Sequence, residues 1–241
     1  MGNGEDHPLD NVVWTALTTM HASIAVGSGL ARHYPRDMAP FSAVAEPTAR
    51  AYADLAEGLR PGIEARLFRP REEPTPPGWE TLSARPIIQM IVEKPGPSSG
   101  TAHDISIDPL AIDAASDMLA LAEVAKPGPF SARTVLLGNY IGVRESVNGR
   151  LIAMAGERFR LPGYVELSAI CVHPDARRCG LGRTLTEHLM QKAFDRGEVP
   201  FLQVFPDNPA ASLYARCGFR ERARPWVIWR RPAPTIKSVG A

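Results

Sequence analysis

Two neighbouring segments carry the clearest hydrophobic patterns in the chain. Residues 164–172 are almost continuously apolar after Glu166, which is typical of a central strand. Residues 181–195 place Leu181, Leu185 and Leu189 on one face, and Gly197 follows the last polar turn. This pattern predicts an amphipathic helix that starts directly after the strand and its turn.

Weaker patterns predict further elements on both sides of this pair. The other predicted helices are 11–20, a segment after Pro47 with Tyr52, Leu55, Ala56 and Leu59 on one face, 111–125, and a short helix opened by Asn208 and Pro209 and closed by Gly218. The other predicted strands are 64–68, 80–84, 87–93, 105–107, 140–145, 150–158, 199–205 and one or two within 219–229. The dipeptide Asn148-Gly149 predicts a hairpin turn. The second half therefore reads β-α-ββ-β-α-β-α-β, an α/β sheet with parallel pairing near its middle.

Proline-rich stretches divide the chain near its middle. Residues 70–78 and 95–100 lack the periodicity of a helix or strand and are interpreted as loop or linker. We expect a boundary at about residue 100, with a smaller α/β N-terminal half over 1–100 and a second domain over 101–235.

Composition narrows the class of protein. The chain has 241 residues, of which 44% are hydrophobic and 22% charged, as in ordinary globular proteins. No apolar run approaches the length of a membrane span, and the first residues lack the cationic and apolar regions of a secretory signal. Three cysteines are too few and too odd in number for a disulfide framework. We therefore expect a cytoplasmic protein with no membrane partner.

The net charge of +1 is unevenly distributed. Residues 1–100 carry nine Lys and Arg against twelve Asp and Glu, and residues 101–241 carry eighteen against fourteen. This asymmetry is either chance or a sign that the second half handles an anion. Neither half is basic enough to indicate a nucleic-acid partner. His21 and His33 have no metal-ligand spacing, so no metal is predicted.

The junction between the central strand and the amphipathic helix carries the candidate chemistry. Gly180 and Gly182 lie where the chain turns into the helix, so main-chain N–H groups there would point outward and unpaired. Together with the positive end of the helix they form an anion site, and Arg177, Arg178 and Arg183 add charge. Two glycines alone would equally fit an ordinary turn. The P-loop and the dinucleotide fingerprint fit worse, because their further residues are missing.

Two motifs in this half resemble the GNAT acetyltransferase superfamily. The first is Val172-His173-Pro174 followed by Arg177-x-x-Gly180-x-Gly182. The second is a later segment that runs Asn208-Pro-Ala-Ala211-Ser-Leu213-Tyr214-Ala-Arg-Cys-Gly218-Phe219. The resemblance covers about residues 104–232. Within the superfamily, the strands that contain residues 153–157 and 199–202 look most like the group of glycine N-acyltransferase-like enzymes.

The resemblance implies a mixed, mostly antiparallel sheet with two splayed parallel strands at its centre. It also implies acyl transfer from acetyl-CoA, the co-substrate, to a primary amine, which is either a small molecule or a protein N-terminus. The cofactor-binding residues that it implies are Ile170, Cys171, Val172, Arg177, Arg178, Cys179, Gly180, Leu181, Gly182, Arg183, Asn208 and Tyr214. The N-terminal half is predicted to be a degenerate GNAT-like unit that closes the acceptor cleft.

Two residues are predicted to be catalytic. Tyr214 is the candidate general acid, because a leaving thiolate benefits from a nearby proton donor; its alternative is a packed aromatic side chain. Glu166 is the candidate general base; its structural alternative is a charge at a strand start that faces water. The resemblance also leaves open a chain of water molecules as the base in place of Glu166. Trp226 and Trp229 either line an acceptor pocket or pack the last strands.

Three functions stay open at this point. The chain is predicted to be an N-acetyltransferase. It could instead use another acyl-CoA, as a glycine-type N-acyltransferase does, or it could bind CoA without catalysis.

Overall fold

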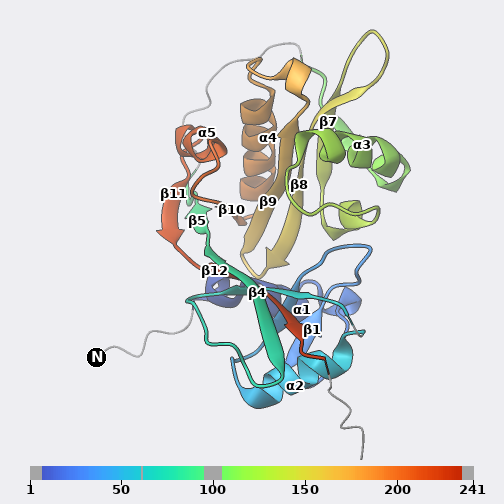
Figure 1. Ribbon diagram of the computed structural model, residues 1–241. Helices are drawn as coiled ribbons and strands as arrows, with labels where there is room; N and C mark the ends of the chain where they lie inside the picture. Colours follow the sequence, from blue (N-terminus) through green and yellow to red (C-terminus); the bar gives the residue numbers. More distant parts are fainter. Residues whose placement is uncertain (1–6, 61, 95–104, 235–241) are drawn as a thin grey trace, which may run out of the picture.

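A computed structural model describes residues 7–60, 62–94 and 105–234 of the chain (Figure 1). Its largest unit is a seven-stranded sheet in the order β11-β5-β10-β9-β8-β7-β6. These strands are β5 (Ile88–Ile91), β6 (Asp108–Leu110), β7 (Tyr140–Arg144), β8 (Leu151–Leu161), β9 (Tyr164–Val172), β10 (Val199–Val204) and β11 (Arg220–Ala223). All neighbours pair antiparallel except β9 and β10, so the predicted mixed sheet with a central parallel pair is confirmed.

The parallel pair separates along its length. β9 and β10 pair only over their first residues, ending at Phe201 opposite Glu166. Farther along β9, Ala169 has a φ of +52°, and two residues of β9 there face one residue of β8. Such a bulge bends its strand. Among the residues that the structure describes, the edge of β9 that faces β10 has no partner strand beyond Glu166, as the predicted splay requires.

Helices cover the large sheet. The helix α4 (Leu181–Asp195) packs on β8 and β9, and its inward leucines join a core with residues of β7, β8 and β10. The other helices of this part are α3 (Ala115–Ala125) and α5 (Ala210–Arg216), with short 3₁₀ turns at Ile112–Ala114, Thr134–Leu137 and Pro174–Ala176. Figure 1 shows α4 along the splayed strands, with α3 and α5 on opposite sides of it.

A second, smaller lobe packs under one end of the large sheet (Figure 1). It contains a three-stranded sheet in the order β3-β12-β4 and a two-stranded sheet of β1 and β2. The strands are β1 (Ala31–His33), β2 (Ser42–Val44), β3 (Ala65–Arg69), β4 (Trp79–Pro86) and β12 (Trp226–Pro232). The helices are α1 (Val12–Thr18) and α2 (Ala49–Gly58), with 3₁₀ turns at Pro8–Asn11 and Ala22–Ile24.

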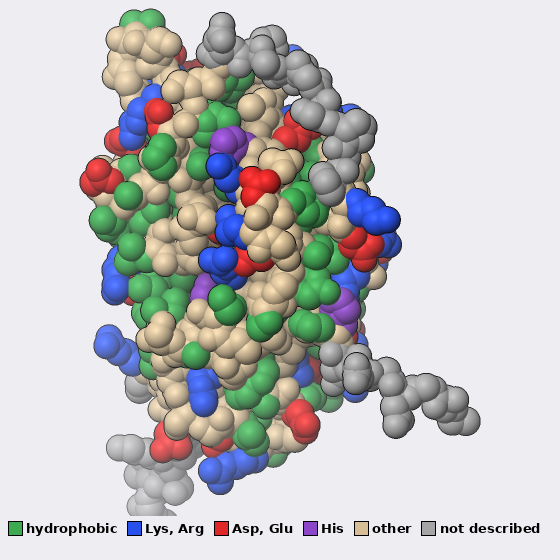
Figure 2. Space-filling view, turned by 180° about the vertical axis from the view of Figure 1, so that it is seen from behind, with side chains coloured by type: hydrophobic (Ala, Val, Ile, Leu, Met, Phe, Trp, Pro, Cys, Tyr) green, Lys and Arg blue, Asp and Glu red, His purple; other side chains and the backbone are tan. Residues whose placement is uncertain are grey.

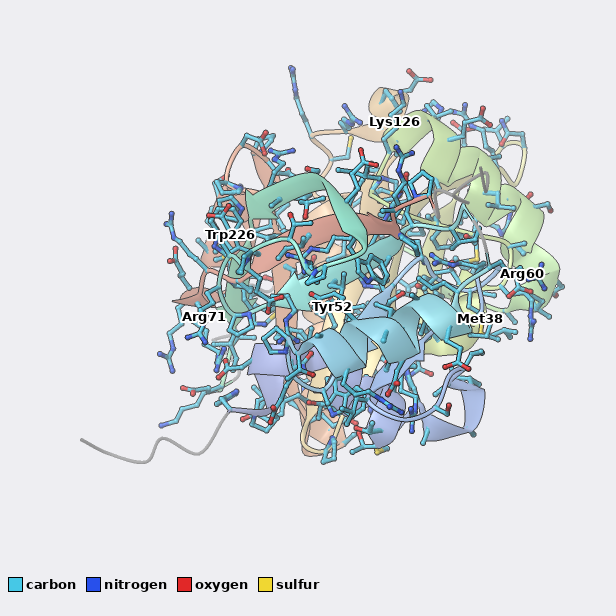
Figure 3. All side chains as sticks on the ribbon, turned by 60° about the horizontal axis from the view of Figure 1, so that its bottom comes forward. Met38, Tyr52, Arg60, Arg71, Lys126 and Trp226 are labelled. Carbon is cyan, nitrogen blue, oxygen red and sulfur yellow. The ribbon has the colours of Figure 1, made fainter. Side chains whose placement is uncertain are left out.

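Buried hydrogen bonds between polar groups join α2, β12 and residues 73–74 of the smaller lobe. Tyr52 lies on α2 and faces the strands (Figure 3). Its hydroxyl donates a hydrogen bond to Glu73 and accepts one from Arg230. The Arg230 side chain is fully buried and also donates to the carbonyl oxygens of Glu73 and Pro74 at 2.8 and 2.9 Å. Because each group has a partner, the desolvation cost of burying these charges is offset.

Segments from both sides of residue 100 contribute to the seven-stranded sheet and to the three-stranded sheet. β5, from the first hundred residues, extends the large sheet, and β12, from the end of the chain, lies between β3 and β4. The predicted division into 1–100 and 101–235, and the degenerate GNAT-like character of the first half, stay predictions.

One predicted strand was misplaced, and two further strands were not predicted. The strand expected over 105–107 lies instead at Asp108–Leu110, where it pairs with β7. The strands β1 and β2 were not predicted at all. Each of these strands has three residues, too few for a period-two pattern to stand out.

The face opposite to that of Figure 1 carries charges of both signs (Figure 2). Lys, Arg and His side chains run down the middle of this face, with acidic side chains beside them. In the described part of the chain, no helix has both the length and the apolar character needed to cross a bilayer.

Gly156 fixes the close approach of β7 and β8. It lies opposite Tyr140, and a Cβ atom at Gly156 would overlap the buried Tyr140 ring. We expect Gly156→Ala to lower the free energy of unfolding by about 1–3 kcal/mol, the usual cost of overpacking a core. A urea titration measures it. The control is Gly182→Ala, whose new Cβ would meet its neighbours at 3.6 Å or more. An unchanged unfolding midpoint for Gly156→Ala would contradict the assigned strand register.

Candidate active site

A cavity of about 900 Å³ opens where β9 and β10 separate. Its walls come from β9, β10, the turn before α4, helix α5 and the residues that follow α3. Lys126, which is labelled in Figure 3 and has a left-handed conformation at the end of α3, also lines it. A cavity of this size suits a small-molecule ligand.

The turn before α4 presents main-chain donors to this cavity. Arg178 and Gly180 have φ values of +66° and +79°, and helical pairing begins only with the N–H of Thr184, which donates to Gly180 O at 3.0 Å. Within the described residues, the N–H groups of 178–183 have no acceptor. Successive free N–H groups in such a turn form a nest for anions, and the helix dipole adds to it. The predicted anion site therefore has the required main-chain geometry.

Arginine side chains surround the nest. Arg177, Arg178 and Arg183 all line the cavity. Arg177 donates to Val172 O at 3.4 Å, and Arg183 donates to Glu187 at 2.7 Å. The Cβ position of Gly180 has no atom within 4 Å, so the space in front of the nest is open. A diphosphate fits this donor set and charge.

The end of β9 supplies an unpaired strand edge beside the nest. Cys171 and Val172 pair with β8 on one side, and both line the cavity on the other. Burial raises the pKa of Cys171 to about 12, so its sulfur is a protonated thiol at neutral pH rather than a nucleophile. The free edge can pair with an amide-containing chain such as a pantetheine arm.

Tyr214 reaches the same cavity from α5. Its side chain is only 9% exposed and packs edge-on against Phe219. Burial raises the pKa of Tyr214 to about 12, so the phenol stays protonated at every pH below that value. Asn208, before α5, accepts from the N–H of Ala210 at 2.9 Å and also lines the cavity. Asn208 therefore both accepts a hydrogen bond at the start of α5 and lines the cavity.

Glu166 lies behind the cavity wall rather than on it. Its carboxylate is fully buried and accepts two hydrogen bonds of 2.7 Å from Arg158 and one of 3.0 Å from Gln203. Both Arg158 and Gln203 line the cavity, whereas Glu166 does not. The side chain thus holds the Arg158 guanidinium in place.

The predicted cofactor residues come together with one exception. All of them except Cys179 line the cavity described above. Cys179 is exposed, and its thiol donates to Arg177 O at 3.6 Å. This grouping agrees with the predicted site, whose individual binding roles stay predictions.

Sequence reasoning missed the far end of the cavity. Phe41, Arg66, Phe68 and Arg158 line it together with Trp229. The hypothesis that the N-terminal half closes the acceptor side agrees with this lining. Of these residues only Trp229 was predicted from the sequence, because the five come from four separate segments and share no motif spacing.

A mixed sheet with splayed central strands and a main-chain anion nest beside them defines an acyl-CoA-dependent acyltransferase site. The family described as FR47-like protein matches residues 140–227. The solved structure of a putative GNAT-family acetyltransferase from Novosphingobium aromaticivorans is 35% identical, with a TM-score of 0.85 over 95% of this chain and 100% of that one. The chain belongs to the GNAT family of N-acetyltransferases, so the predicted superfamily is confirmed.

Other relatives extend this comparison. A [ribosomal protein bS18]-alanine N-acetyltransferase from Salmonella typhimurium is 37% identical over 99 residues, which are 39% of this chain and 66% of the relative. The Escherichia coli enzyme of the same name is 38% identical over 34% of this chain and 56% of its own length. The chain thus spans less than two thirds of these curated relatives. A GCN5-related N-acetyltransferase from Kribbella flavida has the same fold, with a TM-score of 0.58 at 19% identity over 93% of this chain and 96% of that one.

Proposed function

We propose that this protein transfers the acetyl group of acetyl-CoA to a primary amine. The observation that carries the proposal is the nest of unpaired N–H groups at 178–183, which opens into the same cavity as the free β9 edge and Tyr214. These are the parts that a diphosphate, a pantetheine arm and a leaving thiolate require.

The residues divide the chemistry as follows. The nest and its arginines bind the diphosphate of the co-substrate, and the β9 edge orients the arm that carries the thioester. A main-chain N–H near residues 170–172 polarises the thioester carbonyl as negative charge develops on its oxygen. The amine nitrogen forms a bond to the carbonyl carbon, and the C–S bond then breaks. Tyr214 donates its proton to the departing sulfur and regains one from solvent.

Acetylation of a panel of amines tests this proposal. The protein is incubated with acetyl-CoA and each amine, and mass spectrometry records which amine gains one acetyl group. Release of CoA is followed in parallel with a thiol reagent. Absence of acetyl transfer to every amine, despite tight binding of acetyl-CoA, would leave only a CoA-binding role.

The glycine-type N-acyltransferase reading concerns the acyl group. The aromatic residues Phe41, Phe68 and Trp229 line the cavity, which would suit a larger acyl chain. A comparison of acetyl-CoA with benzoyl-CoA on one acceptor decides between the readings. A higher kcat/KM with benzoyl-CoA would favour the glycine-type activity.

The hydrogen bonds of Glu166 bear on the identity of the general base. Glu166 stays a prediction for this role, but both of its oxygens already accept from Arg158 or Gln203. Among the described residues, no Asp, Glu or His lines the cavity. We therefore propose that the amine loses its proton to solvent and that Glu166 positions Arg158.

Glu166→Gln separates these two roles. We expect it to lower the free energy of unfolding by about 3–5 kcal/mol, because the Arg158 side chain, only 12% exposed, would lose its counter-charge. A urea titration measures this loss. Glu80→Gln, which breaks an exposed pair with Arg231, should cost under about 1 kcal/mol. If Glu166→Gln folds with parental stability but its pH–rate profile loses the ascending limb, Glu166 is the base.

We also propose that the protein works in the cytoplasm. The three cysteines are unpaired in the structure, and Cys179 is exposed. Free thiols of this kind persist in a reducing compartment.

A further inference from the structure

The end of the cavity away from the nest combines aromatic rings with cationic groups. Phe41, Phe68 and Trp229 all belong to the smaller lobe, and Trp229 lies on its strand β12. Two arginines lie among these rings, Arg66 on β3 and Arg158 on β8. This end lies in the same cavity as Tyr214, so it is the place where an acceptor would bind.

The two arginines differ in their pairing. The charge of Arg158 is balanced by the two hydrogen bonds to Glu166, and its guanidinium lies 4.7 Å from the centre of the Phe41 ring. Burial acts to lower the pKa of Arg158, but the buried carboxylate of Glu166 outweighs it and raises the pKa. Arg158 is therefore a fixed part of the wall rather than a free cation.

Arg66 has no such partner. It pairs with Trp229 across the β3–β12 ladder, and its guanidinium lies 4.0 Å from the Trp229 ring centre. Within the described residues, the half-buried guanidinium makes no hydrogen bond or ion pair. Burial lowers the pKa of Arg66, and the negative charge of Glu64 opposes that shift. An arginine stays protonated under these conditions, so this end of the cavity holds a positive charge that has no ion-pair partner among the described residues.

The sign of this charge selects among amines. Among the described residues, the cavity lining includes no carboxylate that could attract an ammonium group. A polyamine or another purely cationic acceptor would therefore find no carboxylate to pair with there and would be repelled by the two guanidinium groups, although the aromatic rings attract cations. An acceptor with its own carboxylate would form a charge-assisted pair with Arg66, and its apolar part would pack on Phe41 and Phe68.

We propose that the acceptor is a free amino acid with an apolar side chain, whose carboxylate is bound by Arg66. This inference rests on the proposed acetyl transfer and names the acceptor class for the same site. A protein N-terminus lacks this carboxylate, because an amide takes its place, so it would not gain the Arg66 contact.

Matched acceptors test the carboxylate. L-phenylalanine, L-phenylalaninamide and 2-phenylethylamine share the ring and the amine, and a peptide with N-terminal alanine represents the protein acceptor. Rates with acetyl-CoA are corrected for the unprotonated fraction of each amine. We expect kcat/KM for phenylalanine to exceed that of the other three by about 10- to 100-fold, as for a charge-assisted hydrogen bond.

Matched variants test the arginine. Arg66→Gln should erase the preference by raising KM for phenylalanine, with kcat/KM for the amide and the affinity for acetyl-CoA unchanged. Arg66→Lys should keep part of the preference, since the charge remains. Arg85→Gln is the control, because Arg85 also lies over an aromatic ring, Phe205, but is paired with Asp207 and lies off the cavity wall. It should leave all four acceptors unaffected.

The outcomes separate this inference from the proposed function. Equal rates for the acid and the amide, or an Arg66→Gln variant with the parental preference, would overturn the inference while acetyl transfer stands. If no amine is acetylated, the proposed function fails, and calorimetry with phenylalanine on the CoA-loaded protein decides the inference. Binding that Arg66→Gln abolishes would support it, and absence of binding would overturn it.

Discussion

Gly180→Glu should abolish acetyl-CoA binding, with at least a 100-fold rise in the Kd measured by calorimetry. The new carboxylate would lie in front of the N–H groups of 178–183 and would repel a diphosphate at the same place. The protein should still fold, because a Cβ at this position meets no atom within 4 Å. The cost to folding is the φ of +79°, which a residue with a Cβ adopts at about 1–2 kcal/mol.

Two controls separate charge from backbone strain. Gly180→Gln has the same size and the same unfavourable φ, but no charge, so its Kd should rise far less. Gly182→Ala has ordinary contacts with Leu213 and Val172 and should bind like the parent. Raising the salt concentration should narrow the gap between the Glu and Gln variants. Parental affinity in Gly180→Glu would show that the diphosphate binds elsewhere and would remove the basis of the proposed function.

Tyr214→Phe should lower kcat by about 100-fold and leave the Kd for acetyl-CoA unchanged, as for the loss of a general acid. The hydroxyl has no protein partner within the described residues, so its removal should not change the unfolding midpoint. The raised pKa, about 12, favours the neutral phenol. The proton donor is therefore present across the neutral range and is lost only as pH rises towards that value. Tyr214 should give kcat no descending limb below about pH 10.

Tyr140→Phe is the matched control for this variant. Tyr140 is also buried, burial raises its pKa, and its hydroxyl has no hydrogen-bond partner within the described residues, but it does not line the cavity. Its loss should leave kcat unchanged. If both variants keep the parental kcat, Tyr214 is a packed aromatic side chain, which was the alternative interpretation of its place in the sequence.

The best predicted elements are those whose sequence signals are local. Residues 164–172 and 181–195 were predicted as strand and helix, and the structure has β9 and α4 with the same bounds. A long apolar run and a repeated leucine face each suffice to fix an element of this length. The turn between them was also predicted, since Gly180 needs a left-handed φ that glycine alone adopts without strain.

The prediction for Glu166 shows where local signals fail. Its place on the central strand was correct. Whether that carboxylate faces substrate or another side chain depends on Arg158, which lies on the neighbouring strand. Only the register of β8 against β9 brings Arg158 to both oxygens of Glu166.

The sequence by itself determined the half of the site proposed to bind the diphosphate, because a strand, a glycine turn and a helix follow one another within about twenty residues. The tertiary structure alone decided the acceptor half. Insertion of β12 between β3 and β4 places Trp229 against Arg66, and the same lobe brings Phe41 and Phe68 to the cavity. Contacts between segments so far apart depend on strand order, which no local spacing of residues encodes.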